Sequence, residues 1–345
     1  MPAAPVGEPA LDLTGPWPPP GPECRRLWLA AAGRAVAEDA AWLTAFPAGD
    51  AQVREQLGGL LGTDPRRLVL TSGIRAGAAA LARTARRVLI ECPTFAGVPP
   101  VFASAGCEVR LRPWEALAGE QRRWSPDLVW LTSPARNPDG RTAPPELLAE
   151  LAAGGRVAVN TVYRWFAAPA RLPAGCVVVG GTSKLAGGGT RIGWLHHPDG
   201  PVDPAPAERA TAPAHLLQRT WAHFLGADGL AALDRSMVRP VGRAAAAYRA
   251  AAGLPAVPDP VPFLLLDPAP GVSEDDLVAA FGRRGLRVGP GTAFHAPSPT
   301  VRVCFARLSE AEAAEAGKRT RALAAAGSVR LDQSLPSGTS PGDRR

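Results

Sequence analysis

Lysine is almost absent from this chain of 345 residues, although basic side chains are common. Lysine and arginine together number 38, yet only Lys184 and Lys318 are lysines. Lysine differs from arginine because its amine can lose a proton and attack a carbonyl carbon, whereas the guanidinium group stays charged. A lysine retained in such a sequence is therefore a candidate for covalent chemistry. The alternative is an ordinary surface lysine in a flexible loop.

Cysteine and long apolar runs are also scarce. The five cysteines are odd in number and include no C-x-x-C pair, which disfavours a disulfide framework and a zinc site and predicts reduced thiols in the cytoplasm. No run approaches the roughly 18 apolar residues of a membrane span. The first residues are rich in proline and do not resemble a signal peptide. The net charge is +7, but the arginines are scattered, so we expect no nucleic-acid, membrane or metal partner.

Short apolar runs alternate with helical patterns along much of the chain. We expect strands at 67–71, 87–91, 108–112, 127–132, 156–160, 176–180 and 191–196. Helical spacing fits between several of these runs, at 74–85, 98–105 and 145–153. This alternation predicts an α/β fold whose large domain has three layers around a seven-stranded, mostly parallel sheet. In such sheets, ligands bind beyond the carboxyl ends of the strands.

The later part of the chain predicts a smaller α+β lobe. Helical patterns at 216–224 and 230–251 lead into short strands and helices that end near residue 326. The expected division is a disordered segment 1–10, an N-terminal segment 11–42 associated with the small lobe, a large domain 43–225, the small lobe 226–326 and a disordered tail 327–345.

The residues that follow the expected strands are the informative ones. Thr71-Ser72-Gly73 closes the first strand and opens a helix at Ile74, and this kind of junction presents free N–H groups and a positive helix end to a phosphate. Lys184 follows the sixth strand, and Arg191, seven positions later, can pair with the same phosphate. Phe95, Asn137, Asn160 and Tyr163 follow other strands. Each residue alone also has an ordinary explanation, such as a core side chain or a turn.

In this order, the segments resemble the fold type I pyridoxal-phosphate enzymes. The resemblance is to the class I/II aminotransferases and to the aminotransferase-like domain of related transcription regulators, and it runs from about residue 11 to 326. It implies pyridoxal 5'-phosphate as the cofactor and Lys184 as the lysine of the internal aldimine. It also implies an amino acid and a keto acid as substrates, and a homodimer.

The resemblance assigns the other site residues as follows. Ser183, Arg191 and the backbone at Gly73 and Ile74 would hold the phosphate, Phe95 would stack on the pyridine ring, Asn137 and Tyr163 would bond its phenolic oxygen, and Arg302 and Gly15 would bind the substrate carboxylate.

The most consequential departure from the family is Asn160, which stands where the family has an aspartate. A carboxylate at that position keeps the pyridine nitrogen protonated, which strengthens the ring as an electron sink. Asparagine is neutral and can instead donate a hydrogen bond to an unprotonated nitrogen. Two smaller departures are Thr44, in place of a tyrosine, and Asp139, in place of a threonine.

We therefore keep several functions open. The first is an aminotransferase-like enzyme in a specialised biosynthetic pathway. The second is another reaction on the same cofactor, namely elimination, cyclisation, decarboxylation or oxidation. The third is a non-catalytic cofactor-binding homologue. A regulator is less favoured because the fold begins near residue 11, which leaves no space for an N-terminal DNA-binding domain.

Overall fold

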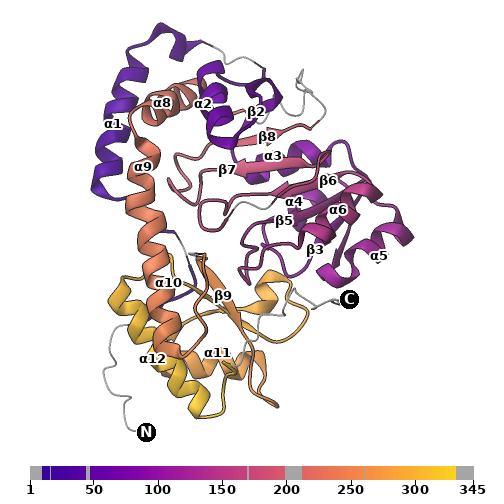
Figure 1. Cartoon of the computed structure of the whole chain (residues 1–345), viewed down its shortest axis with the longest axis vertical. Coiled ribbons are helices and arrows are strands. Elements are labelled where there is room, and N and C mark those ends of the chain that lie inside the picture. Colours follow the sequence, from indigo (N-terminus) through magenta and orange to yellow (C-terminus); the bar gives the residue numbers. More distant parts are fainter. Residues whose placement is uncertain are drawn as a thin grey trace, which may run out of the picture.

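The computed structural model describes residues 10–15, 17–43, 47–168, 171–198, 212–259 and 261–331. Within these ranges the chain forms a large domain around a seven-stranded sheet and a smaller lobe of short strands and helices (Figure 1). The segment predicted to be disordered, apart from Ala10, lies outside the described residues, as do Thr44 and residues 332–345.

The large sheet has the strand order β2-β8-β7-β6-β5-β3-β4. Its strands are β2 (Leu68–Thr71), β3 (Arg87–Glu91), β4 (Glu108–Arg112), β5 (Leu128–Thr132), β6 (Val157–Asn160), β7 (Val177–Gly181) and β8 (Gly193–His196). Neighbouring strands pair in parallel except β8, which runs antiparallel to both β2 and β7. The predicted α/β fold with its mostly parallel, seven-stranded sheet is thereby confirmed.

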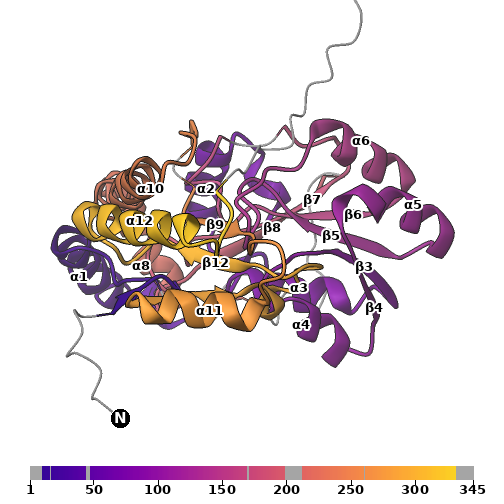
Figure 2. The ribbon, with the colours of Figure 1, turned by 90° about the horizontal axis from the view of Figure 1, so that it is seen from below.

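Helices cover both faces of this sheet. Every residue of β5 and β6 is buried, which explains why these strands read as continuous apolar runs rather than alternating ones. The core on one face includes side chains of α3 (Ile74–Ala82) and α4 (Pro99–Ser104). The core on the other face includes side chains of α5 (Trp114–Trp124) and α6 (Pro145–Gly154). Figure 2 shows the two pairs on opposite sides of the strands.

A column of helices joins the large domain to the small lobe (Figure 1). It consists of α9 (Gly229–Leu233), a π-helical turn (Asp234–Val238) and α10 (Arg239–Ala252), which packs along α12 (Glu310–Ala325). At the other end of the column, α8 packs against α1 and α2. These helices are α1 (Pro22–Val36), α2 (Ala51–Leu61) and α8 (His215–Gly226). Short 3-10 helices lie at η1 (Asp39–Trp42), η2 (Pro65–Arg67) and η4 (Gly291–Phe294).

The small lobe is built from two short sheets. The first has the order β11-β12-β9 and is antiparallel, and the second pairs β1 with β10 in parallel. Their bounds are β1 (Leu11–Asp12), β9 (Phe263–Leu266), β10 (Leu286–Arg287), β11 (Gly289–Pro290) and β12 (Val301–Cys304), and α11 (Glu274–Arg283) packs beside them. The N-terminal segment is thus divided, because β1 belongs to the small lobe whereas α1 packs on α8.

The predicted disordered tail begins too early at Gly327. Val329 forms a β-bridge with Pro268, is buried, and packs in the core of the small lobe together with Leu331. An apolar pair within five otherwise polar residues was too weak a pattern to indicate this contact. No helix in the described ranges is both long and apolar enough to cross a membrane.

Candidate active site

A cavity of about 310 Å³ lies at the carboxyl ends of β5, β6 and β7. Its lining residues are Trp17, Ile74, Arg75, Phe95, Thr132, Asn137, Asn160, Val162, Tyr163, Ser183, Lys184, Gly188 and Arg191. Most of the residues predicted for the cofactor site therefore line one cavity, as the rule for the strand ends of parallel sheets predicts. Gly73, Gly15 and Arg302 do not line it: Gly73 precedes Ile74, Arg302 donates a hydrogen bond to Asn137, and Gly15 lies beside Arg302.

Lys184 lies in this cavity among aromatic rings. Its Nζ atom is 5.2 Å from the ring centroid of Trp17 and 5.7 Å from that of Tyr163. Burial is the main cause that lowers the pKa of Lys184 to about 8; the nearby Cys304 thiol opposes the shift, and the charges of Arg302 and Arg75 add to it. The unprotonated amine, which is the form that attacks carbonyl groups, is therefore far more populated near neutral pH than in an ordinary lysine, whose pKa is about 10.4.

This lowered pKa predicts a distinctive pH profile for the labelling of Lys184. With a small acylating reagent such as acetic anhydride, we expect the rate for Lys184 to rise with pH and to level off above about 8. A free lysine peptide levels off only near about 10.4. Peptide mass spectrometry reports Lys184 and the exposed Lys318 in one digest, so Lys318 is an internal reference for reagent decay. A Lys184 midpoint equal to that of the free peptide would contradict the described environment.

The amino end of α3 lies at one end of the cavity with its backbone N–H groups uncapped. Gly73 is its N-cap residue, with φ of +104°, and no side chain caps the helix. The pairing of Thr71 with Gly193 brings the start of β8 next to Gly73, and the Arg191 side chain lies 3.3 Å from where a Cβ atom on Gly73 would be. Uncapped N–H groups, the helix dipole and Arg191 together suit an anion.

Asn160 presents an amide to the cavity in a fixed orientation. Its Oδ1 atom accepts a hydrogen bond from the Val162 N–H at 3.1 Å, and its Nδ2 atom donates to Thr132 Oγ1 at 3.3 Å. Because the backbone N–H needs an acceptor, the amide oxygen is fixed on Val162 and the NH₂ group on Thr132, which leaves the second N–H of that group as a donor. The position that the sequence marked as unusual is therefore a buried, neutral donor.

Arg302 joins three distant parts of the chain. It lies on β12 of the small lobe and donates through Nη1 to Asn137 Oδ1 at 3.0 Å and through Nη2 to the carbonyl oxygen of Thr14. The Phe294 ring stacks 4.3 Å from its guanidinium carbon. Its buried Nε atom has no hydrogen-bond partner in the described part of the chain. The guanidinium group is thus held in place by two of its five N–H groups, and the Nε–H is among those that remain.

Gly15 lies beside this arginine, where no side chain fits. A Cβ atom there would be 2.5 Å from Cys304 Sγ and 3.0 Å from Arg302 Nη2, and the backbone has φ of +79°.

Tyr163 is fully buried against Phe263, at 4.9 Å between ring centroids. Burial raises the pKa of the Tyr163 hydroxyl, and the Arg302 charge and the Asn137 side chain act in the opposite direction. Its hydroxyl therefore stays protonated and can donate a hydrogen bond.

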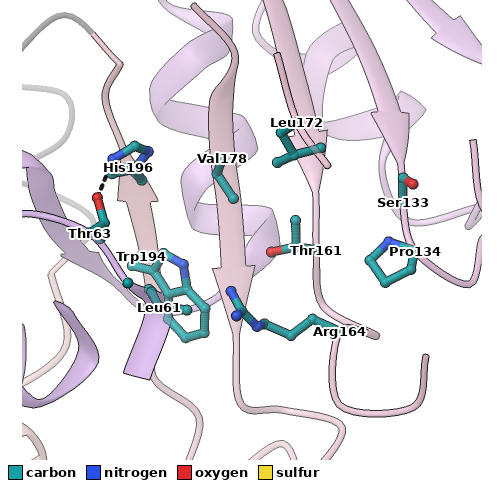
Figure 3. A pocket seen from close by; sticks show the side chains of 11 residues that line it. Leu61, Thr63, Ser133, Pro134, Thr161, Arg164, Leu172, Val178, Trp194 and His196 are labelled. Carbon is teal, nitrogen blue, oxygen red and sulfur yellow. Dashed lines mark hydrogen bonds between the residues drawn. The ribbon is translucent and has the colours of Figure 1, made fainter. Parts of the chain in front are cut away.

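A second cavity, of about 270 Å³, lies elsewhere on the large sheet (Figure 3). Its lining residues are Leu61, Gly62, Thr63, Ser133, Pro134, Thr161, Arg164, Leu172, Val178, Trp194 and His196. Thr63 and His196 form a hydrogen bond there at 2.6 Å. None of the predicted site residues lines it, and it contains no lysine. The predicted site residues therefore converge on the cavity of Lys184 and not on this one.

Sequence reasoning missed Arg75, Thr132, Val162 and Gly188, which also line the site. Thr132, Val162 and Gly188 have ordinary sequence contexts at the ends of strands and in loops. Arg75 did carry a signal, because it follows Ile74 in the first turn of α3. Basic residues are unfavourable at that end of a helix, where acidic residues are preferred.

A family model described as "Aminotransferase class I and II" matches residues 25–319. No curated protein sequence matches the chain.

Solved structures share its fold at low sequence identity. An α-aminoadipate aminotransferase from Thermus thermophilus, complexed with N-(5'-phosphopyridoxyl)-L-leucine, has a TM-score of 0.76 at 21% identity, covering 92% of this chain and 93% of that chain. An aspartate aminotransferase from Thermus thermophilus with maleate has a TM-score of 0.72 at 22% identity, covering 91% and 92%. An archaeal alanine:glyoxylate aminotransferase has a TM-score of 0.75 at 19% identity, covering 92% and 91%.

Proposed function

Because this chain belongs to the aminotransferase class I and II family, we propose that it transfers an amino group between an amino acid and a keto acid in the cavity of Lys184. Family membership makes the protein a pyridoxal-phosphate-dependent transferase. The observation that carries the proposal is the buried amine of Lys184, with its lowered pKa, between an uncapped helix end and the fixed guanidinium group of Arg302.

The residues present fit the cofactor. The uncapped N–H groups of α3, with Ser183 and Arg191, would hold its phosphate, because these groups have no anionic side chain among them. Phe95 and Val162 offer apolar surface for the ring, and the Asn160 NH₂ group offers a donor to the ring nitrogen. When bound, the cofactor supplies an aldehyde that accepts the amino group and a ring that accepts electrons from the bond broken at the substrate α-carbon.

The side chains of this chain have distinct tasks in the proposed reaction. Lys184 holds the cofactor through its amine and, once released, moves the substrate α-proton as a general base. Arg302 binds the substrate α-carboxylate, because its buried Nε–H lacks a partner in the described residues and its plane is fixed by Asn137. Tyr163 and Asn137 hydrogen-bond the phenolic oxygen of the ring. The rings of Trp17 and Tyr163 lie beside the Lys184 amine and shield part of it from water.

A second candidate function is another reaction on the same cofactor, and Asn160 favours it. A neutral donor at the ring nitrogen leaves the ring a weaker electron sink, which slows removal of the α-proton. Elimination, cyclisation, decarboxylation and oxidation are the candidate reaction types. The same feature supports a role in a specialised biosynthetic pathway, and the buried, unpaired cysteines support a cytoplasmic location.

The test is to load the purified protein with pyridoxal phosphate, record its visible spectrum and add amino acids one at a time. We expect a cofactor band that decays with each accepted substrate, and mass spectrometry should find the matching keto acid in equal amount. Products other than the keto acid, formed without transfer of the amino group to the cofactor, would support the second candidate. A band that no amino acid alters would support a non-catalytic homologue, and the absence of any band would contradict the proposed site.

We further propose that the protein is a homodimer. An apolar patch on α1 and η1, formed by Leu29, Val36, Trp42 and Leu43, is exposed, with Leu29 and Trp42 each 71% accessible. Trp42 Nε1 donates to the Val36 carbonyl oxygen at 3.2 Å, which holds part of this patch together. Patches of clustered large apolar side chains usually mark protein interfaces.

Light scattering tests the dimer directly. We expect a mass of twice 35.8 kDa for the native chain and a mass of 35.8 kDa for Trp42→Arg, because a charge in an apolar interface is costly. The matched control is Leu60→Arg on α2, an exposed leucine outside the patch. A monomeric native protein, or a Trp42→Arg variant that remains dimeric, would contradict this interface.

A further inference from the structure

The second cavity, shown in Figure 3, lies on the face of the large sheet that is turned away from α3. Val178 of β7 lines it, whereas the neighbouring Val177 and Val179 pack in the core beneath α3. Because side chains alternate between the two faces along a strand, the cavity and α3 are on opposite faces. Its volume of about 270 Å³ is just below the roughly 300–1,000 Å³ of common ligand pockets, so it suits a small molecule.

Trp194 brings a buried N–H group without an acceptor to this cavity. Its side chain is fully buried, and its Nε1 atom has no hydrogen-bond partner within the described ranges. The ring packs directly on Gly180, where a Cβ atom would be 2.3 Å from Nε1, so the ring has little room to turn. An indole nitrogen can only donate, so only an acceptor can satisfy it. A buried donor without an acceptor is destabilising.

Arg164 brings a positive charge to the same cavity without a counter-charge. Figure 3 shows its side chain extending along the cavity toward the Trp194 ring. The side chain is half-buried and makes no ion pair or hydrogen bond with the described part of the chain. Burial lowers the pKa of the guanidinium group, with no carboxylate to oppose the shift. Its one ring contact, 5.7 Å from the centre of Trp165, provides no acceptor.

The other polar side chains of the lining add no further charge. Thr63 and His196 form a hydrogen bond with each other, and Thr161 Oγ1 donates to the Val179 carbonyl oxygen at 3.4 Å. Burial is the main cause that lowers the pKa of His196, so its ring is neutral near neutral pH. No acidic residue lines the cavity. The lining therefore has a single full charge, that of Arg164, which matches an anion with one negative charge.

We propose that this cavity is a second binding site, which takes a small monocarboxylate with an apolar tail. The carboxylate would accept hydrogen bonds from the Arg164 guanidinium group and from the Trp194 Nε1–H, and so satisfy both donors. The tail would lie against the apolar part of the lining, which consists of Leu61, Pro134, Leu172 and Val178. No lining residue is shared with the Lys184 cavity, so the inference does not depend on the proposed function.

Calorimetry with butyrate tests this site after the proposed carboxylate site of the other cavity has been removed. The titrations use the Arg302→Met protein, loaded with pyridoxal phosphate. We expect butyrate to bind, and the neutral butyramide, of similar size, to bind about tenfold more weakly. The cofactor-free protein should give the same affinities, so a failure of the proposed function leaves this test intact. Equal binding of butyramide, or no binding of butyrate, overturns the proposal.

Two substitutions in the same background each remove one donor. Arg164→Met and Trp194→Phe should each weaken butyrate by about tenfold. The matched controls are Arg171→Met, an exposed arginine between β6 and β7, and Trp130→Phe, which removes another buried indole N–H without a partner in the described residues. Neither control residue lines the cavity, so both should bind butyrate normally. Thermal melts identify any misfolded variant.

Nitrogen-15 NMR of the labelled tryptophan side chains tests the site without a substitution at it. The indole N–H signal of Trp194 is identified by its absence in the Trp194→Phe protein. Butyrate at concentrations that saturate the calorimetric titration should shift this signal and leave that of Trp130 in place. A Trp194 signal that does not move, or an Arg164→Met protein that binds butyrate as well as Arg171→Met does, overturns the proposal and leaves a cavity filled by water only.

Discussion

Replacing Lys184 with alanine should lower the rate of amino transfer by about 100-fold to 10,000-fold, the range attributed to a positioned general base. The variant loses both the amine that holds the cofactor and the base that moves the α-proton. The other contacts to the cofactor remain, because the α3 end, Arg191 and Asn160 do not depend on the lysine. We therefore expect the variant still to bind pyridoxal phosphate, but reversibly and without the band of the lysine-bound form. Stopped-flow spectroscopy and dialysis measure both properties.

The only other lysine gives the matched control for this substitution. Lys318 lies on α12 with its side chain 71% exposed and 3.8 Å from Glu315, far from the cavity in the sequence and in the fold. Lys318→Ala should retain native turnover and the native band. A Lys184→Ala variant that keeps either the covalent band or native turnover would remove Lys184 from the proposed mechanism.

Replacing Asn160 with aspartate should increase the rate of amino transfer by about tenfold or more, because a carboxylate next to a basic nitrogen favours its protonated form by about 1–3 pKa units. The fold should tolerate the change. One carboxylate oxygen can keep accepting from the Val162 N–H, and the other can accept a hydrogen bond from Thr132 Oγ1, which now acts as donor. Nitrogen NMR of the cofactor labelled at its ring nitrogen reports the protonation state directly.

The control for this substitution is Asn160→Ala, which removes the amide without adding a charge. Its ring nitrogen should stay unprotonated and its rate of amino transfer should not rise. If the native protein already holds a protonated ring nitrogen, or if Asn160→Asp leaves both the NMR shift and the rate unchanged, Asn160 does not set the electronic state of the cofactor. The second candidate function then loses its support.

The large sheet could be predicted from the sequence because each of its strands has a strong local pattern. Strands such as β6 are buried on both faces and therefore consist of short apolar runs between turns. The position of the candidate site follows from that sheet, since Asn160 ends β6 and Lys184 follows β7, and the carboxyl ends of these two strands meet. The resemblance of the motifs to a known family then assigned roles that spacing alone left open, and these roles stay predictions for the individual residues.

Other features depend on contacts that no local pattern reports. Helix α5 was not predicted, because its sequence is rich in charged residues. The structure buries one of them, Glu120, and pairs its charge with Arg110 and Arg112 of β4. The contact of Gly15 with Cys304 joins residues from opposite ends of the chain. Arg75 was visible as an unusual residue in a helix start, but its convergence with Lys184 and Arg191 required the fold.

Carboxylate binding at Arg302 competes with hydrogen bonds that the protein itself already makes. Before a ligand arrives, the guanidinium group already donates to the Asn137 amide and to the Thr14 carbonyl group. A carboxylate must use the N–H groups that remain, namely the Nε–H and the second N–H of each Nη atom, or take over a bond that a neutral acceptor now holds. The measured affinity is then the difference between two sets of hydrogen bonds and not the strength of an isolated ion pair. Neutral amide analogues of a substrate have little to gain in that exchange, so discrimination against them comes from the competition inside the protein itself.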